Sequence, residues 1–335
     1  MSMTSTVPSV LLIDQATVSS VAELDELIVA VESAFAAHAT GQSLEPKLAH
    51  VEADGGEFHI KTGGLRSHGR TYFACKVGAG FFQNRIRFGL PNIVGLIMLN
   101  DGTTGVPLAV MDSSTVTRLR TGAATAVAAK YLARPDSRTA LICGAGVQAA
   151  IQLRSLAQTL PLARAHVWSR HDPRPFVQKM SSELDIEVLP SDDLLPAALD
   201  SDVIVTCTPA RGWFLGRSHV KPGTFIAAVG ADSPGKQELE PELVSQCSVV
   251  CDILEQCIHV GELQYARPVG AAGYTNVRGQ LGEVITGKVA GRQNPGEIIL
   301  FDSTGTALQD VAAAALVYER CLARGLGQNF SFLPQ

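Results

Sequence analysis

The second half of the chain alternates short apolar runs with stretches of helical periodicity. The runs contain few polar residues, as expected for parallel strands that helices cover on both faces. The predicted strands span residues 139–143, 165–169, 186–189, 203–207, 225–229, 249–253 and 298–301. Their alternation with helical stretches predicts an α/β fold with a doubly wound parallel sheet of the Rossmann type.

The first third of the chain has a different pattern. Apolar strands are predicted at residues 58–61, 72–77, 93–99 and 108–112, separated by turns rich in glycine. They indicate a second lobe, of the α+β class and rich in strands. An alanine-rich helix, capped by Ser113 or Ser114, is expected to run to about Leu132 and to link the two lobes.

The last helix determines how the lobes divide the chain. It is expected from Ala307 to about Arg324, with apolar residues at roughly helical spacing that could pack back on the strand-rich lobe. The first domain would then be discontinuous. Residues 1–118 with 307–335 are predicted to form one domain, and residues 119–306 the other.

Composition narrows the functional classes. The 335 residues are 46% apolar, and 27 basic against 32 acidic residues give a net charge of −5. This balance offers no excess of positive charge for nucleic acid or an anionic membrane surface. The longest apolar run, residues 93–99, is far short of the ~20 residues that span a bilayer. Because the N-terminus is polar and shows no secretory pattern, the protein is expected to be cytoplasmic.

The seven cysteines do not suggest a disulfide framework, because their number is odd and several lie in apolar runs. Cys247, Cys251 and Cys257 are followed by His259 and form the one cluster whose composition suggests zinc. Their spacing is not that of a zinc knuckle or ribbon. Packing in the core is therefore the favoured interpretation, and no metal site is predicted.

A glycine-rich turn follows the predicted strand at residues 139–143. Gly144 and Gly146 belong to a G-x-G-x-x-A pattern that leads into a helix, in which Val147 and Gln148 come first. Such a turn lets the backbone approach a pyrophosphate at the positive end of the helix, so a dinucleotide site is predicted. An ordinary turn between a strand and a helix is the alternative.

The residues at the end of the predicted strand 165–169 help to indicate which dinucleotide is bound. Sites for NAD(H) often place an acidic residue here, but the strand ends at Ser169 and Arg170. A hydroxyl and a guanidinium could hold a 2′-phosphate, so NADP(H) is modestly favoured over NAD(H). Asp172 is close enough to keep NAD(H) open, and Arg170 could equally be a solvated surface charge.

Three charged residues are candidates for the chemistry. Lys76 lies in an apolar stretch, where a buried ammonium needs an anion such as a substrate carboxylate, although lysines also reach solvent from strand edges. Arg120, on the linking helix, could bind a carboxylate or phosphate or form an interdomain ion pair. Asp232 follows a buried strand at the edge where parallel sheets bind ligands. It could exchange protons with a substrate nitrogen, or it could simply shape a turn.

Several of these residues lie in runs that combine into one pattern. Lys76 is joined by the runs at residues 120–126, 132–137, 144–149, 230–239 and 301–305. Together they resemble the ornithine cyclodeaminase/mu-crystallin family over nearly the whole chain. The resemblance implies a homodimer that pairs through its strand-rich lobes, a Rossmann domain that binds NAD(P)(H), and a substrate in the cleft between the domains.

The resemblance also implies roles for individual residues. Lys76 resembles the lysine that binds the substrate carboxylate, Arg120 a cation near substrate and cofactor, and Asp232 the acid/base. Lys47 would take the place of a substrate-binding arginine. Residues 58–64 stand where ornithine-cyclising members carry a methionine-proline turn, so Lys61 is either a further pocket cation for a more anionic substrate or a solvated strand end. The remaining expected contacts are Thr304 to the substrate, and Thr121, Gly146, Val147, Gln148, Thr208, Val229, Lys236 and Ser303 around the cofactor.

The leading hypothesis is hydride transfer at the α carbon of a small amino or imino acid, by an imino acid reductase or amino acid dehydrogenase. One alternative is a cyclodeaminase for ornithine or a related diamino acid, which shares the first step but releases ammonia without net redox change. Another is a non-catalytic protein of the mu-crystallin type that binds a dinucleotide or other ligand. Asp232 argues against the last alternative, because a binding protein needs no proton donor at that position.

Overall fold

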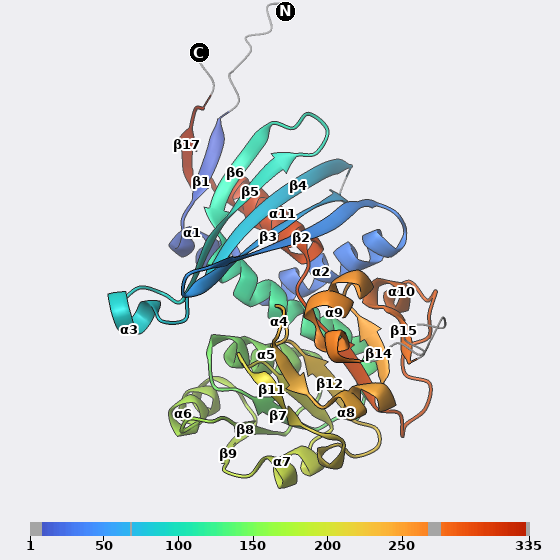
Figure 1. Ribbon diagram of the computed structural model, residues 1–335. Helices are drawn as coiled ribbons and strands as arrows, with labels where there is room; N and C mark the ends of the chain where they lie inside the picture. The colour runs from blue at the N-terminus through green and yellow to red at the C-terminus, as the bar shows by residue number, and fades with distance from the viewer. Residues whose placement is uncertain (1–8, 68, 267–275, 333–335) are drawn as a thin grey trace, which may run out of the picture. The chain divides into compact units, whose positions relative to one another are not determined.

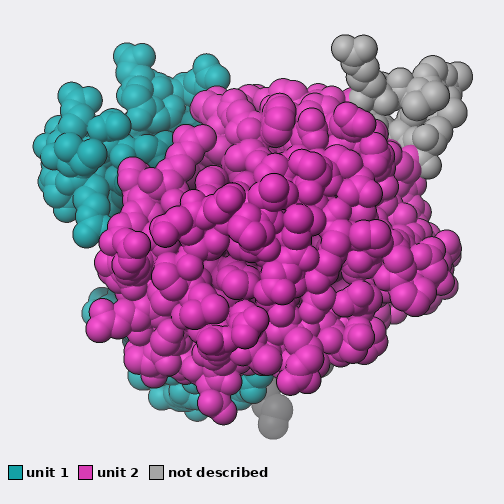
Figure 2. All heavy atoms as spheres, turned by 90° about the horizontal axis from the view of Figure 1, so that it is seen from below, with its two compact units in different colours: residues 1–120, 306–335 teal, residues 121–305 magenta. Residues whose placement is uncertain are grey.

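The computed structural model describes residues 9–67, 69–266 and 276–332 (Figure 1). The chain divides into two compact units: unit 1 comprises residues 1–120 with 306–335, and unit 2 comprises residues 121–305 (Figure 2). The boundaries expected from the sequence, after residues 118 and 306, lie within two residues of this division. No helix in the described ranges is long and apolar enough to cross a membrane.

Unit 1 is built on a seven-stranded mixed sheet. In sheet order its strands are β17 (Gln328–Phe330), β1 (Val10–Ile13), β6 (Pro107–Asp112), β5 (Ile93–Asp101), β4 (Arg70–Gly80), β3 (Gly56–Ser67) and β2 (Ser43–Ala53). The neighbours from β6 to β2 pair antiparallel, whereas β1 is parallel to β6 and antiparallel to β17. This sheet confirms the predicted strand-rich lobe and adds strands at both of its edges.

Two long helices cover part of one face of this sheet (Figure 1). They are α2 (Leu24–Ala39) and α11 (Ala307–Arg324), and α11 packs against α2, β3 and β4. The alternation of side chains along the strands gives the sheet two different faces. On the face toward α11, Tyr72, Ala74, Ile97 and Leu99 are at most 1% exposed. Two shorter helices, α1 (Gln15–Val21) and α3 (Asn84–Phe88), complete the unit.

The opposite face of the unit 1 sheet carries apolar side chains that the described residues leave partly exposed. Val77, Val94, Leu96 and Met98 lie there, because Val77 pairs with Leu96 and their neighbours in register face the same way. They are 42%, 41%, 57% and 41% exposed. A contiguous apolar surface of this kind on a sheet is typical of a contact surface for another protein.

The helix α4 (Ser113–Leu132) begins in unit 1 and continues in unit 2. Its predicted range is confirmed, but the predicted cap is not, since Asp112 Oδ2 accepts a hydrogen bond from Thr115 N at 2.9 Å. A carboxylate at this end also complements the positive end of the helix dipole. Within unit 2, a Cβ at Gly122 would lie 2.5 Å from Ser155 Oγ, so only glycine allows α4 to approach its neighbour this closely.

Unit 2 confirms the predicted doubly wound parallel sheet. In sheet order its strands are β15 (Val277–Gln280), β14 (Ser248–Cys251), β16 (Ile299–Asp302), β12 (Phe225–Ala228), β10 (Val203–Thr206), β7 (Thr139–Cys143), β8 (Arg164–Trp168) and β9 (Glu187–Ser191). All neighbours are parallel. The chain order reverses between β7 and β10, and this reversal marks the crevice where such sheets bind ligands.

The remaining elements of unit 2 lie between these strands. They are the helices α5 (Val147–Thr159), α6 (Arg174–Glu183), α7 (Leu194–Asp200), α8 (Pro241–Gln246), α9 (Leu254–Val260) and α10 (Leu281–Ile285), and the small pair β11 (Arg211–Leu215) and β13 (Gln237–Leu239). The core strands β7, β10 and β12 are almost entirely buried, which explains their continuous apolar sequences.

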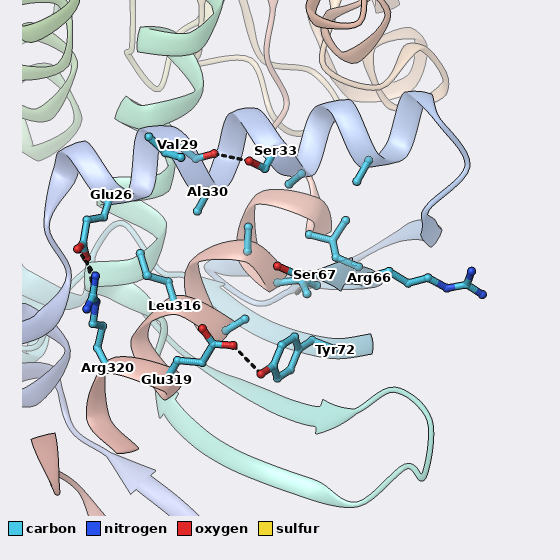
Figure 3. Close-up of a pocket in the computed structure, with 16 residues that line it drawn as sticks. Glu26, Val29, Ala30, Ser33, Arg66, Ser67, Tyr72, Leu316, Glu319 and Arg320 are labelled. Carbon is cyan, nitrogen blue, oxygen red and sulfur yellow. Dashed lines mark hydrogen bonds and ion pairs between the residues drawn. The ribbon is translucent and has the colours of Figure 1, made fainter. Parts of the chain in front are cut away.

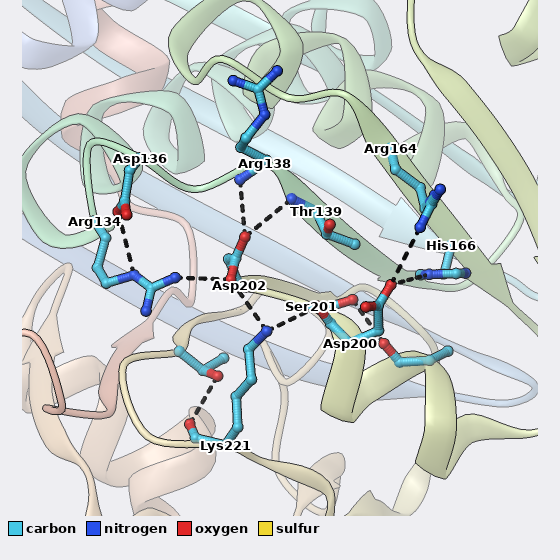
Figure 4. Close-up of polar contacts among 12 residues, drawn as sticks. Arg134, Asp136, Arg138, Thr139, Arg164, His166, Asp200, Ser201, Asp202 and Lys221 are labelled. Atoms are coloured by element: carbon cyan, nitrogen blue, oxygen red, sulfur yellow. Dashed lines mark hydrogen bonds and ion pairs between the residues drawn. The ribbon is translucent and has the colours of Figure 1, made fainter.

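A partly buried polar network fixes the amino ends of β7 and β10 (Figure 4). Asp202 accepts hydrogen bonds from Arg138 N at 2.9 Å and Thr139 N at 3.2 Å, and pairs with Arg134 at 2.8 Å and Lys221 at 3.2 Å. Burial alone would raise the pKa of Asp202, but these donors outweigh it and hold the pKa below its usual value. The network secures the end of the sheet away from the predicted ligand edge.

Candidate functional site

Unit 1 contains a cluster of buried cations. Lys61 on β3 and Lys76 on β4 are direct cross-strand neighbours, so their side chains share the face toward α11. Lys61, Lys76 and Arg120 are each 4% exposed. The structure therefore brings together three of the residues that the sequence singled out, and it excludes the interpretation of Lys61 as a solvated strand end.

A single carboxylate in α11 holds this cluster together. Lys76 Nζ lies 2.9 Å and 2.8 Å from the two oxygens of Asp310. Arg120 Nε donates to Asp310 Oδ1 at 3.1 Å, and Arg120 Nη1 donates to Gln309 Oε1 at 2.7 Å. Lys76 Nζ also donates to Thr117 Oγ1 at 3.3 Å. We refer to Lys61, Lys76, Arg120 and Asp310 together as the cation cluster.

The electrostatics of the cation cluster favour a further anion. Burial lowers the pKa of Lys76 to about 7; Asp310 opposes this shift, whereas Arg120 and Lys61 add to it. Burial would raise the pKa of Asp310, but Lys76, Arg120 and Lys61 outweigh it and keep the pKa below its usual value. Lys76 and Arg120 thus pair with the same carboxylate at full burial, with the positive charge of Lys61 nearby. Their charged N–H groups suit a ligand carboxylate.

Two members of this arrangement, Gln309 and Asp310, were missed by the sequence analysis. Their signal was present, because an amide and a carboxylate interrupt the apolar face of the helix at 307–324 and are 0% and 1% exposed. Lys47, by contrast, does not join the cluster. It pairs in register with Thr62 and so lies on the opposite face from Lys61, where its exposed side chain is 3.8 Å from Glu45.

In unit 2, the glycine-rich turn has the backbone that a dinucleotide site needs. Gly144 has a φ of 129°, a conformation that L side chains rarely adopt, and a Cβ there would lie 3.2 Å from Cys207 Sγ. Gly146 is the N-cap of α5 and, having no side chain, provides no cap for the N–H groups of the first turn. A Cβ at Gly146 would meet nothing within 4 Å. The turn thus offers open space at the positive end of a helix, which is the property that binds phosphate.

A cavity of about 480 Å³ opens beside this turn at the carboxyl ends of β7, β8 and β10. Trp168 and Phe214 form an apolar wall, with ring centroids 5.1 Å apart. Sequence analysis did not identify either ring as part of the site, although Trp168 directly precedes the predicted Ser169. The other lining residues are Gly144, Ala145, Gly146, Ser169, Arg170, His171, Asp172, Cys207, Thr208, Pro209 and Ala210.

The polar rim of this cavity bears on the predicted cofactor. Arg170 lines the cavity and makes no ion pair with any residue that the structure describes. Asp172 also lines the cavity, and its Oδ1 accepts hydrogen bonds from Arg174 N and Arg174 Nη1, both at 3.1 Å. Among the described residues, Gln148 Oε1 in the first turn of α5 is buried without a hydrogen-bond partner, as expected for a group that contacts a ligand. Thr121 and Val147, which were also assigned to the cofactor, lie in α4 and at the exposed start of α5.

Asp232 lies just beyond the end of β12, as predicted. Its carboxylate is 40% exposed, and Lys236 Nζ donates to Asp232 Oδ1 at 2.6 Å. Lys236 was assigned to the cofactor from the family resemblance, so its bond to the proposed acid/base is a finding of the structure. Val229, also assigned to the cofactor, is held between the strands by its N–H, which donates to Thr206 O at 2.9 Å.

Glu238 fixes the two loops that flank this edge, and the sequence analysis missed it. Its Oε1 accepts hydrogen bonds from Thr208 N and Thr208 Oγ1, both at 2.7 Å, and its Oε2 accepts from Gly230 N at 2.9 Å. Burial raises the pKa of Glu238, although these donors oppose the shift. Thr208, predicted to contact the cofactor, is thus at the cavity with its hydroxyl held in place.

Two further predicted residues follow β16. Ser303 N donates to Ala228 O at 3.0 Å, which ties it to the end of β12. Thr304 Oγ1 donates to Asp252 Oδ1 at 3.0 Å and lies 3.2 Å from Gln256 Oε1, both within unit 2. The structure therefore shows a hydroxyl held by a buried carboxylate at the position assigned to the substrate, and Asp252 is another residue that the sequence analysis missed.

The cysteine cluster packs as a core, as favoured from the sequence. Cys247, Cys251 and Cys257 are at most 2% exposed, and Cys257 Sγ donates to Asp252 Oδ1 and to Asp302 O at 3.4 Å and 3.3 Å. His259 is exposed, and its Nδ1 lies 2.7 Å from Glu255 O within its own helix. The three thiols and this imidazole therefore do not converge on one point.

A second cavity, of about 350 Å³, lies within unit 1 between α2, α11 and the strands β3 and β4 (Figure 3). Its walls are mostly apolar, and two polar pairs lie at its margin: Tyr72 with Glu319 at 2.7 Å, and Arg320 with Glu26. Its lining contains none of the residues predicted to act in binding or catalysis. This cavity is therefore separate from the candidate site.

Comparisons with known proteins agree with this architecture. The family model described as "Ornithine cyclodeaminase/mu-crystallin family" matches residues 9–325. An alanine dehydrogenase of Archaeoglobus fulgidus is 37% identical over 325 residues, covering 96% of this chain and 98% of that protein. The solved structure of an archaeal alanine dehydrogenase dimer with bound NAD is 37% identical with a TM-score of 0.91, covering 97% of this chain and 100% of that chain. The Δ1-pyrroline-2-carboxylate reductase of Thermococcus litoralis, in complex with NADH and L-proline, is 32% identical with a TM-score of 0.90, covering 96% and 100% of the two chains. The chain therefore belongs to the ornithine cyclodeaminase/mu-crystallin family.

Proposed function

We propose that the protein is an NAD(P)(H)-dependent oxidoreductase that transfers hydride at the nitrogen-bearing carbon of a small amino or imino acid. The observation that carries this proposal is the buried cation cluster of unit 1, in which Lys76 and Arg120 are held by Asp310 and Lys61 lies beside Lys76. Such a cluster suits the carboxylate that every amino or imino acid carries. Relatives named alanine dehydrogenase and Δ1-pyrroline-2-carboxylate reductase support the same class of substrate.

The residues of unit 2 fit a bound dinucleotide. The uncapped start of α5 and the open space above Gly146 suit a pyrophosphate, and Gln148 offers an unpartnered buried oxygen. Trp168 and Phe214 offer apolar surface to an adenine ring. Arg170, at the rim, could contact a 2′-phosphate, and this favours NADP(H) over NAD(H). When bound, the dinucleotide supplies or accepts the hydride.

The protein's own residues bind, orient and exchange a proton. Lys76 and Arg120 hold the substrate carboxylate, and Lys61 adds positive charge beside them. Asp232 exchanges the proton on the substrate nitrogen, and Lys236 holds its Oδ1 in one position. Fixed orientation of the reacting groups is then the main contribution of the chain to catalysis.

We also propose that a second copy of the chain covers the apolar outer face of the unit 1 sheet. Val77, Val94, Leu96 and Met98 form an exposed surface there, and a related solved structure is described as a dimer. Light scattering after size-exclusion chromatography should give twice the chain mass, and Leu96→Asp should give a monomer. A wild-type protein that is monomeric at micromolar concentration would contradict this part of the proposal.

A substrate screen tests the central proposal. Alanine, ornithine, lysine, proline and cyclic imino acids are offered with each dinucleotide, while nicotinamide absorbance and ammonia are followed together. A reductase or dehydrogenase changes the absorbance in proportion to product. Release of ammonia with a cyclic product and no net absorbance change would instead identify a cyclodeaminase.

The variant Asp232→Asn separates catalysis from binding. Turnover should fall by about 10²- to 10⁴-fold, the usual contribution of a general acid or base, while dinucleotide binding stays intact. Asp192→Asn, at an aspartate whose side chain is 88% exposed, serves as the matched control and should behave as wild type. Equal turnover in wild type and Asp232→Asn would remove Asp232 from the mechanism and favour a non-catalytic binding role.

A further inference from the structure

A cluster of imidazole and carboxylate groups lies on the hairpin of β2 and β3, and the proposed function does not use it. His50 and His59 are direct cross-strand partners, with ring centroids 5.1 Å apart. Glu57 lies two residues before His59, so its side chain shares the same face of the strand. His50 Nε2 is 3.0 Å from Glu57 Oε2, and His59 Nε2 is 3.3 Å from Glu57 Oε1.

We propose that His50, Glu57 and His59 bind a divalent transition metal, with Zn²⁺ the best match. The candidate ligand atoms of the three residues lie within 4.8 Å of one another. Around a tetrahedral zinc ion with bonds of about 2.0–2.1 Å, neighbouring donor atoms are about 3.3 Å apart. Each imidazole nitrogen lies near this spacing from one Glu57 oxygen, at 3.0 Å from Oε2 for His50 and at 3.3 Å from Oε1 for His59, so the three groups converge on one region. Two imidazoles and a carboxylate also form a donor set that suits zinc better than Ca²⁺ or Mg²⁺.

The surroundings of these three residues favour a preorganised metal site over a chance contact between surface side chains. The side chains of His50, Glu57 and His59 are 16%, 10% and 15% exposed, so the donor atoms lie close to solvent but are largely enclosed. A carboxylate at this depth gains from adjacent positive charge, which a divalent ion would supply. The hairpin places the donors from paired strands, where the backbone fixes their spacing before any ion binds.

The neighbouring strand leaves room for the rest of the coordination sphere. Gly78 and Gly80 of β4 pair in register with His59 and Glu57, so no side chain of β4 extends from these two positions over the site. A Cβ at Gly78 would meet only His59 O, at 3.9 Å, whereas one at Gly80 would lie 3.7 Å from Phe82 Cζ, so the more open side is at Gly78. Three protein ligands would leave a fourth position for water or a carboxylate oxygen, the composition typical of an open zinc site. The site shares its sheet face with Lys61, two residues from His59 along β3, or about 7 Å.

Metal binding to the full-length, tag-free protein tests this proposal. After removal of metals with a chelator, the protein is titrated with Co²⁺, whose visible absorption reports coordination by imidazole, and then with Zn²⁺ in competition. One ion per chain is expected, with Zn²⁺ displacing Co²⁺. His50→Gln and His59→Gln should each weaken binding at least tenfold and reduce the Co²⁺ absorption.

His166→Gln is the matched control. His166 also contacts a carboxylate, since its Nε2 is 2.9 Å from Asp200 Oδ2, and its side chain is likewise 16% exposed, but the described part of unit 2 gives this pair no second imidazole. Zn²⁺ should raise the unfolding temperature of wild type and His166→Gln, but not of His50→Gln, because only a folded-state ligand stabilises by mass action.

Three results would overturn the proposal: no stoichiometric binding by wild type, equal binding by His50→Gln and His59→Gln, or an equal loss in His166→Gln. Circular dichroism of each variant checks that it is folded. If a histidine variant does not fold, Glu57→Gln, which keeps the shape of the side chain, must show the weakened binding instead. None of these measurements uses turnover, so their failure would leave the proposed oxidoreductase function standing.

Discussion

Replacing Lys76 by methionine should change how the stability of the protein depends on pH. In the folded chain the pKa of Lys76 is lowered to about 7 from 10.5, mainly by burial. Below pH 7 both the folded and the unfolded state carry the proton, so folding bears the full cost of burying the ammonium. Between pH 7 and 10.5 the unfolded state binds more protons than the folded state, and stability therefore rises with pH.

The size of this effect follows from the same two values. One proton of difference is worth about 1.4 kcal/mol for each pH unit, so the Lys76 contribution to the free energy of unfolding should rise by about 2 kcal/mol between pH 7 and 9. Lys76→Met removes this titration while leaving Asp310 beside Arg120. Other groups also titrate in this range, but they do so in both proteins, so the difference between wild type and variant isolates Lys76.

Urea unfolding at a series of pH values measures the difference. Lys179→Met, on an exposed lysine of α6, is the control and should follow the wild-type pH dependence in parallel. The difference in the free energy of unfolding between Lys76→Met and wild type should decrease by about 2 kcal/mol from pH 7 to 9. A gap that stays constant would show that Lys76 keeps an ordinary pKa, and the electrostatic description of the cation cluster would then be wrong.

Three further predictions concern the cofactor cavity and the apolar cavity. Gly146→Val should leave the unfolding temperature nearly unchanged, because a Cβ at this position meets open space. It should abolish the fluorescence change on adding a dinucleotide, and retained binding would exclude the turn as the phosphate site. Arg170→Ala should weaken NADPH by roughly tenfold or more and NADH little, the scale of one charged hydrogen bond; equal losses for both would refute the 2′-phosphate contact. Ala30→Leu on α2 points a larger side chain into the 350 Å³ cavity and should stabilise unit 1 by roughly 1–2 kcal/mol in thermal unfolding, whereas destabilisation would mean that the cavity cannot admit it.

The parallel sheet could be predicted because its strands carry the signal in their own residues. The β10 and β12 strands are buried along their whole length, so their sequences are apolar without interruption. The β2 strand was not predicted, because charged and polar residues such as Lys47 and His50 fall on a largely exposed edge strand. There, pairing with β3 rather than local hydrophobicity determines the structure.

The same distinction between local and long-range signals applies to the residues of the candidate site. Lys76, Arg120 and Asp232 could be singled out one at a time, since each is a charge in an apolar or sheet-edge context. Their partners could not, because Lys76 and Asp310 are separated by 234 residues and nothing in the spacing links them. The bond from Lys236 to Asp232 is local, at four residues, but the family resemblance directed attention to a different role for that lysine.

The cation cluster also explains why one carboxylate is built into a site that is meant to bind another. Asp310 supplies counter-charge to Lys76 and Arg120 at full burial. It also holds both side chains in fixed positions before a ligand arrives, so binding does not have to order them. A substrate carboxylate then meets charged donors that are already in place. Burying the Lys76 ammonium lowers the free energy of unfolding, and the same ammonium binds the anion. Lys76→Met should therefore be more stable than wild type at neutral pH while binding the substrate carboxylate less well.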